Sequence, residues 1–181
     1  MKKLMIAAAI VCAAVASQAS SFNWKTSATG LLYDGNTTDK YAGTAYLFST
    51  GDLTQQQVLS AWANGSLSTA KALDTQTISA GKITASTDHP FDWGEPDDKL
   101  NAFVVVDDGD KIFISDIASA IGDVAETRTL SFALKTGSQT AALETTTFGT
   151  QGWYTQAVPE PTSGLLLLLG VAGLALKRRR A

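Results

Sequence analysis

One segment, residues 88–98, combines side chains that could bind a sugar. Its sequence is Asp-His-Pro-Phe-Asp-Trp-Gly-Glu-Pro-Asp-Asp. An exposed ring such as Trp93 can stack on the apolar face of a sugar, and carboxylates such as Asp92 and Glu95 accept hydrogen bonds from hydroxyls or bind calcium. Asp92, Trp93 and Glu95 therefore form a candidate ligand loop. The alternative, which we favour, is structural: Phe91 and Trp93 fill one end of the domain while the acids face water.

A second acidic cluster, Asp107-Asp108-Gly109-Asp110, invites a calcium interpretation, because hard cations take several carboxylate oxygens. The cluster lacks the residue order and the distant glutamate of an EF-hand loop. A solvated hairpin turn explains the same residues through their turn propensity, and it is the interpretation we favour. We therefore expect no cofactor, with calcium as the one candidate.

Established catalytic motifs are missing from the sequence. It contains no Gly-x-Ser-x-Gly elbow, no phosphate-binding loop and no Gly-x-Gly-x-x-Gly fingerprint. With one histidine, His89, and one cysteine, Cys12, one chain cannot assemble an ordinary zinc site of three or four such ligands. We therefore expect no catalytic residue, no metal site and no enzyme. A pair of carboxylates for glycoside hydrolysis depends on a distance in space, so a small glycoside hydrolase stays an alternative.

The N-terminus has the pattern of a secretory signal peptide. Met1-Lys2-Lys3 is followed by an apolar stretch, residues 4–16, and by the small residues of a cleavage site ending at Ala19. We expect the secretion translocon and signal peptidase to act on residues 1–19. Cys12 lies in the apolar stretch and would be removed with it.

The part of the chain between its two ends is acidic. Residues 20–157 contain 16 Asp and Glu residues against 8 Lys and Arg residues, a net charge of −8, whereas the whole chain has −3. An acidic surface argues against binding to nucleic acid or to anionic lipid headgroups. The length is that of one domain with its own hydrophobic core.

Short β-prone segments predict strands along this domain. The strongest signal is a hairpin, in which the apolar runs 100–106 and 111–115 flank the Asp-Gly turn at 107–110. Further strands are expected at 30–33, 41–48, 75–78, 82–84, 127–135, 145–148 and 153–154. We expect a frayed start at 20–23, no regular structure at 88–98, and a short helical turn at 117–124.

One helix is expected after residue 51. Asp52 can cap its N-terminus with Gln55 as the capping-box partner, and Val58, Leu59 and Trp62 share one apolar face. Asn64-Gly65 should end it. Together these elements predict a mainly β fold: a β-sandwich-like domain at 20–157 with one short inserted helix. A single sheet with a packed helix is the competing fold.

The C-terminal tail has three parts in a fixed order. Val158-Pro159-Glu160-Pro161-Thr162 precedes an apolar run, residues 164–176, and the basic cluster Lys177-Arg178-Arg179-Arg180. This order resembles the PEP-CTERM sorting signals of exported bacterial proteins, which a membrane enzyme called exosortase processes. The resemblance covers residues 158–181. It implies exosortase as a partner, processing near Pro159-Glu160-Pro161, and an association with exopolysaccharide, biofilm or the cell surface.

The apolar run is short for a permanent membrane anchor. Residues 162–176 would form a helix of roughly 22 Å, whereas a hydrocarbon core is about 30 Å thick. The basic cluster predicts that the end of this helix is cytoplasmic and that the domain lies outside the inner membrane. We therefore expect an inner-membrane-tethered precursor that is later released to the cell surface or the medium.

Together these features predict a non-enzymatic protein of the cell surface or extracellular matrix, acting in adhesion or scaffolding. A secreted carbohydrate-binding module is the alternative, and polysaccharide is the partner it would take.

Overall fold

The computed structural model of this protein describes residues 20–26, 30–33, 38–84, 86–93, 97–123, 126–134, 143–144 and 147–156. Within these residues the chain is mainly β, consistent with a β-sandwich, and has one α-helix. The elements are β1 (Ser21–Thr26), β2 (Gly43–Ser49), α1 (Gln55–Ala63), the 3-10 helix η1 (Thr69–Lys71), β3 (Asp74–Ile78), β4 (His89–Pro90), β5 (Asp98–Asp107), β6 (Lys111–Ile114), β7 (Ala118–Gly122), β8 (Thr127–Phe132), β9 (Leu143–Glu144) and β10 (Gly152–Thr155). The expected signal peptide and the C-terminal tail lie outside the described residues.

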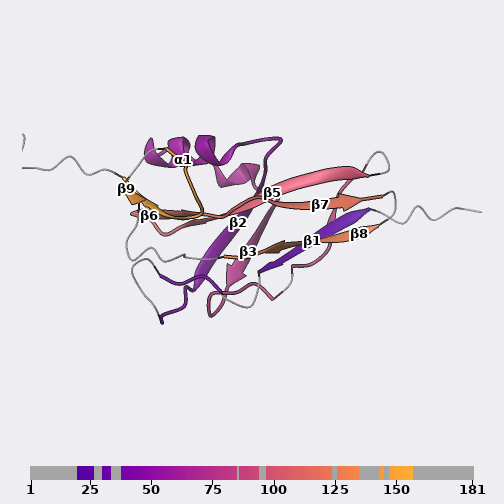
Figure 1. Ribbon diagram of the computed structural model, residues 1–181, viewed down its shortest axis with the longest axis horizontal. Helices are drawn as coiled ribbons and strands as arrows, with labels where there is room; N and C mark the ends of the chain where they lie inside the picture. Colours follow the sequence, from indigo (N-terminus) through magenta and orange to yellow (C-terminus); the bar gives the residue numbers. More distant parts are fainter. Residues whose placement is uncertain are drawn as a thin grey trace, which may run out of the picture.

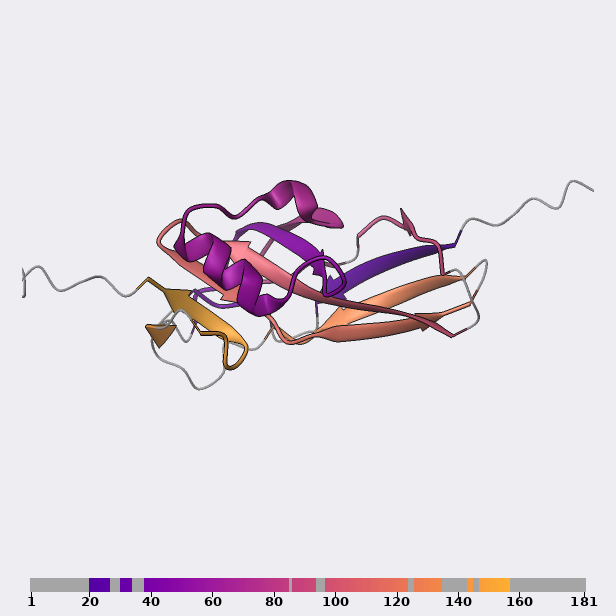
Figure 2. The same cartoon turned by 90° about the horizontal axis from the view of Figure 1, so that it is seen from above.

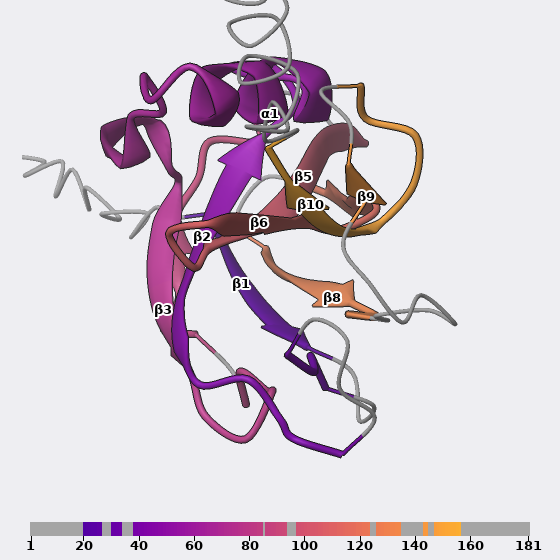
Figure 3. The same ribbon diagram turned by 90° about the vertical axis from the view of Figure 1, so that its left-hand side faces the viewer.

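The strands form three layers together with the helix (Figure 1). A large sheet has the order β3-β2-β5-β6-β10-β9, with β7 also paired to β5, and a small sheet has the order β4-β1-β8. Figure 3 shows α1 on one side of the large sheet and β1 with β8 on the other. The sandwich and the packed helix, which the sequence offered as competing folds, therefore occur in the same domain.

Both faces of the large sheet are buried, which explains the unbroken apolar run in β5. Side chains of Ala102, Val104 and Val106 face the small sheet, whereas Phe103 and Val105 face the helix. A strand that is covered on both sides needs no alternation of apolar and polar residues. The view from above shows α1 lying across the large sheet (Figure 2).

The predicted hairpin is confirmed. β5 pairs with β6 in antiparallel register, with Val106 opposite Phe113 and Asp107 opposite Ile112. Ile112 and Ile114 face the helix, while Phe113 faces the small sheet. Gly109 has a φ of +79°, a left-handed conformation that glycine adopts without strain.

The helical turn expected at 117–124 is wrong, because residues 118–122 form strand β7. Val105 pairs with Ile114 and Ala102 pairs with Ala118, so residues 103–104 of β5 face residues 115–117. β6 and β7 therefore act as one strand that a β-bulge interrupts. Ser115 holds the bulge: its Oγ accepts a 2.8 Å hydrogen bond from Val104 N–H, and its own N–H donates to Val104 O at 2.9 Å.

The frayed start expected at 20–23 is also wrong. β1 is the central strand of the small sheet and runs parallel to β8, from Ser21 opposite Thr127 to Thr26 opposite Phe132. Phe22 and Trp24 are buried. The apolar-polar alternation of this segment is the pattern of a half-buried strand.

The expected helix is confirmed, and the residue that caps it is different. Thr54, not Asp52, is the N-cap: its hydroxyl accepts from Gln57 N–H, and Gln57 Oε1 accepts a 2.8 Å bond from Thr54 N–H. Asn64 is the C-cap, and Val58, Leu59 and Trp62 are buried as predicted. The capping box lies two residues later than expected because the chain turns at Gly51-Asp52 before the helix begins.

Two expected strands are reduced to isolated bridges. Segment 30–33 contributes only the isolated bridge from Leu32 to Lys40, and 82–84 only the bridge from Ser79 to Lys82. Residues 147–148 are coil, whereas 145–146, Val124 and Lys135 lie outside the described residues. In contrast, the strands expected around β2, β3, β8 and β10 are confirmed, and Leu130, Phe132 and Leu134, which alternate along the expected strand 127–135, are buried.

No helix in the described ranges combines the length and apolar character needed to cross a membrane.

Candidate functional site

The ligand loop predicted at 88–98 places its tryptophan in the core. Trp93 has no exposed surface, and its Nε1 donates to the carbonyl oxygens of Ser21 at 3.3 Å and Glu126 at 3.1 Å. The backbone of Gly122 lies directly against the Trp93 ring, so a Cβ at this position would overlap the ring. Trp93 therefore offers no face on which a sugar can stack.

The rest of this loop is also built into the domain. Phe91 packs edge-to-face against Trp93, with ring centres 4.7 Å apart, and contacts Phe22 of β1 at 5.9 Å. His89 and Pro90 form β4, which pairs with β1, although the two prolines and the glycine led us to expect no regular structure. Asp92 is exposed, and Glu95 lies outside the described residues. These contacts agree with the structural interpretation, in which Phe91 and Trp93 fill one end of the domain.

The carboxylates of the acidic turn hold neighbouring side chains. Asp107 Oδ1 accepts from Trp62 Nε1 at 3.2 Å and from Gly109 N–H at 3.0 Å. Asp108 Oδ1 accepts a 3.3 Å bond from the Tyr41 hydroxyl. Among the residues that the structure describes, no three Asp, Glu, His or Cys side chains are grouped so that they could hold a metal ion.

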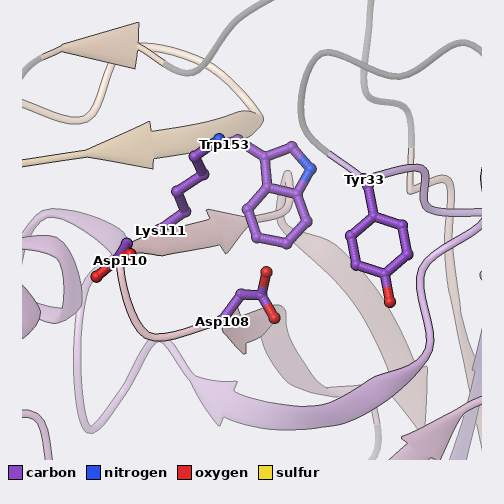
Figure 4. Close-up of a pocket in the computed structure, with 5 residues that line it drawn as sticks. All are labelled: Tyr33, Asp108, Asp110, Lys111 and Trp153. Carbon is purple, nitrogen blue, oxygen red and sulfur yellow. The ribbon is translucent and has the colours of Figure 1, made fainter.

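Next to this turn lies a pocket of about 170 Å³, lined by Tyr33, Asp108, Asp110, Lys111 and Trp153. Figure 4 shows the Asp108 carboxylate pointing toward the space between the rings of Trp153 and Tyr33. Asp110 and Lys111 line the side away from Tyr33. The pocket thus combines aromatic surface with carboxylate acceptors, which is the chemistry that the sequence suggested for residues 88–98.

A row of aromatic rings fixes the pocket wall. Ring centres are 5.0 Å apart between Tyr33 and Tyr41, 5.6 Å between Tyr41 and Trp153, and 5.6 Å between Trp153 and Phe113. Trp153 is buried, and its Nε1 donates a 3.0 Å bond to Leu32 O. Because β10 pairs with β6, Trp153 lies opposite Phe113 and beside the acidic turn. The wall is therefore preorganised by contacts between three separate parts of the chain.

Burial and the negative charge beside the pocket raise the pKa of the Tyr41 hydroxyl. Burial, together with the negative charge of Asp108 and its hydrogen bond, raises the pKa of Tyr41 to about 12. The Tyr41 hydroxyl therefore stays protonated under physiological conditions and keeps donating to Asp108. This bond orients the carboxylate that faces the pocket.

The acidic residues of this pocket could be found from the sequence, but its aromatic residues could not. The acidic turn is apparent as a cluster, and Asp108 and Asp110 belong to it. Tyr33 and Trp153 stand in segments expected to be plain strands, far apart along the chain, and neither carries a local signal for a pocket. Only the pairing of β10 with β6 and the bridge from Leu32 to Lys40 bring them together.

Ala19, the predicted signal-peptide cleavage site, and Pro159 to Arg180 of the predicted sorting signal lie outside the described residues. The tail can be compared with known proteins. No curated protein and no solved structure matches this chain. The family model for the PEP-CTERM protein-sorting motif matches residues 157–180, which confirms the resemblance found in the tail. The chain thus carries a PEP-CTERM sorting motif at its C-terminal end.

Proposed function

We propose that this chain is a non-enzymatic protein of the cell surface or extracellular matrix, which acts in adhesion or scaffolding after an exosortase has processed its tail. The observation that carries this proposal is the sorting motif at residues 157–180. Such a motif implies export, a membrane-anchored precursor and exosortase as the processing partner. The domain ahead of it is then a cargo that works outside the inner membrane.

The described domain supports a structural role. Its buried polar groups serve the fold: Ser115 holds the β-bulge, and Gln151 bridges Asp116 N–H to Ala133 O at 2.8 and 2.9 Å. Asp74 and Asp107 accept hydrogen bonds from the indoles of Trp24 and Trp62. Hydrogen bonds of this kind stabilise a rigid module.

Carbohydrate binding is the second candidate function. The observation that favours it is the pocket between Tyr33, Asp108 and Trp153, where aromatic surface and carboxylates meet. A binding module of this kind would also serve adhesion, because a surface polysaccharide would be its partner.

Sorting can be tested in the native host with a variant that lacks Pro159 to Pro161. We expect unprocessed precursor to accumulate in the inner membrane, as it should in a host without its exosortase. A matched control carries Asp52→Asn, a substitution on the exposed turn before α1 that leaves the tail unchanged. If the Pro159–Pro161 deletion yields mature protein of normal size, the proposal is wrong.

A further inference from the structure

We propose that the pocket lined by Tyr33, Asp108, Asp110, Lys111 and Trp153 binds one ring of a neutral saccharide. This inference rests on the proposed extracellular function, because polysaccharides are then the polymers that the domain meets. It assigns the contact to a site other than residues 88–98, whose tryptophan is buried.

Tyr33 supplies the stacking surface. Among the described residues, the large apolar side chains that are exposed are Tyr33, Ile117 and Ile121, and Tyr33 is 38% exposed. Its ring is backed by Tyr41, 5.0 Å away, and Tyr41 in turn packs on Trp153. An aromatic face that is already fixed in place binds an apolar surface with little loss of conformational entropy, and the C–H face of a pyranose is such a surface.

Asp108 supplies hydrogen-bond acceptors beside this ring, and Asp110 adds a carboxylate on the side of the pocket away from Tyr33. A carboxylate has about four acceptor positions, and the Tyr41 hydroxyl uses one of them on Asp108 Oδ1. Figure 4 shows the Asp108 carboxylate directed toward the space beside Tyr33. Sugar hydroxyls are donors, and hydrogen bonds to a charged acceptor are stronger than those to a neutral one.

Size and charge define the ligand class. The volume of about 170 Å³ is below the range of roughly 300–1,000 Å³ typical of pockets for drug-sized ligands, so the pocket takes no more than one sugar ring and a longer segment would extend into solvent. The acidic turn, in a domain with a net charge of −8, repels uronates and other anionic sugars. A neutral hexose unit within a polymer is therefore the expected ligand.

The test uses the exported protein purified from its host and polysaccharides fixed on a surface: dextran, mannan, galactan and a β-1,3-glucan as neutral probes, with alginate as the acidic one. We expect binding to at least one neutral polymer and none to alginate. Tyr33→Ala and Asp110→Asn should each weaken binding about tenfold or more. Tyr33→Phe keeps the ring and should stay within about twofold, as should Asp52→Asn, an exposed carboxylate away from the pocket.

Urea unfolding, followed by tryptophan fluorescence, checks that each variant is folded. If Tyr33→Ala does not fold, the binding test depends on Asp110→Asn. Binding should be unchanged in EDTA, because the carboxylates contact the hydroxyls directly. The inference is overturned if no neutral polymer binds, if both pocket variants bind like the wild type, or if EDTA abolishes binding. Normal sorting of the same protein in the host would then leave the proposed function intact, whereas failed sorting with retained binding would overturn only that function.

Discussion

The indole Nε1 of Trp24 donates a 2.6 Å hydrogen bond to Oδ2 of Asp74 and so joins the small sheet to the large one. Trp24 lies on β1, at the centre of the small sheet, and Asp74 begins β3, at the edge of the large sheet. Gln76 Nε2 donates to the same oxygen at 2.9 Å. His89 Nε2 also lies 2.9 Å from it, which makes a hydrogen bond when that nitrogen carries a proton.

Replacing this carboxylate should destabilise the domain. The Asp74 side chain is 9% exposed, so Asp74→Ala leaves the Trp24 and Gln76 donors without their acceptor and should lower the free energy of unfolding by about 3 kcal/mol. Asp74→Asn retains an acceptor oxygen and should lose less. Urea unfolding measures both, with Asp52→Ala on the exposed turn as the control. Equal stability of Asp74→Ala and Asp52→Ala would show that the contact contributes nothing.

The helix cap offers a second test, because the structure assigns the N-cap to Thr54 and the sequence pattern assigned it to Asp52. Thr54→Ala removes the acceptor for Gln57 N–H and should lower the free energy of unfolding by about 1 kcal/mol. Asp52→Ala should change it by less than about 0.5 kcal/mol, because an exposed residue outside the helix contributes little. Thermal unfolding of the two variants decides between them. The reverse order would restore Asp52 as the cap.

The raised pKa of Tyr41 makes the stability of the domain depend on pH in alkali. Its pKa is about 12 in the folded protein and about 10 in an unfolded chain, so folding disfavours the tyrosinate. This contribution is fully present below pH 10 and is lost as the pH rises through 12. Carbon-13 NMR of tyrosine labelled at Cζ should show the Tyr41 signal titrating late, and this signal is identified by its loss in Tyr41→Phe.

Asp108→Asn should move that signal to lower pH, because the neutral amide removes the negative charge next to the Tyr41 hydroxyl. Asp52→Asn removes the same charge from an exposed residue on the turn before α1 and provides the matched control. If the Tyr41 signal is unmoved in Asp108→Asn, then burial alone sets its pKa and Asp108 is not oriented by Tyr41.

Elements with strong local patterns could be predicted from the sequence, and those that depend on partners could not. The β5–β6 hairpin follows from two apolar runs around an Asp-Gly turn, and α1 from its apolar face and the Asn64 stop. Apart from Ile121, β7 is built from Ala, Ser and Gly, which have weak strand propensity. It is a strand because β5 offers an edge to pair with and Gly122 lets Trp93 pack closely.

The candidate site also depends on features that the sequence pattern does not contain. Trp93 and Tyr33 both stand in segments rich in polar or small residues, and composition alone cannot say which aromatic is buried. The structure buries Trp93 because β1 and the segment before β8 supply carbonyl acceptors for its indole. It leaves Tyr33 exposed because Tyr41 and Trp153 already occupy the space beneath it.

The intact mass of the mature protein recovered from the host decides whether the tail is a processed sorting signal. We expect a polypeptide that begins at Ser20, ends near Pro159-Glu160-Pro161 and lacks both the apolar run 164–176 and the basic cluster Lys177 to Arg180. In a host without exosortase, the protein should keep both of these parts. If the mature protein from the wild-type host keeps them as well, the tail is not a processed sorting signal.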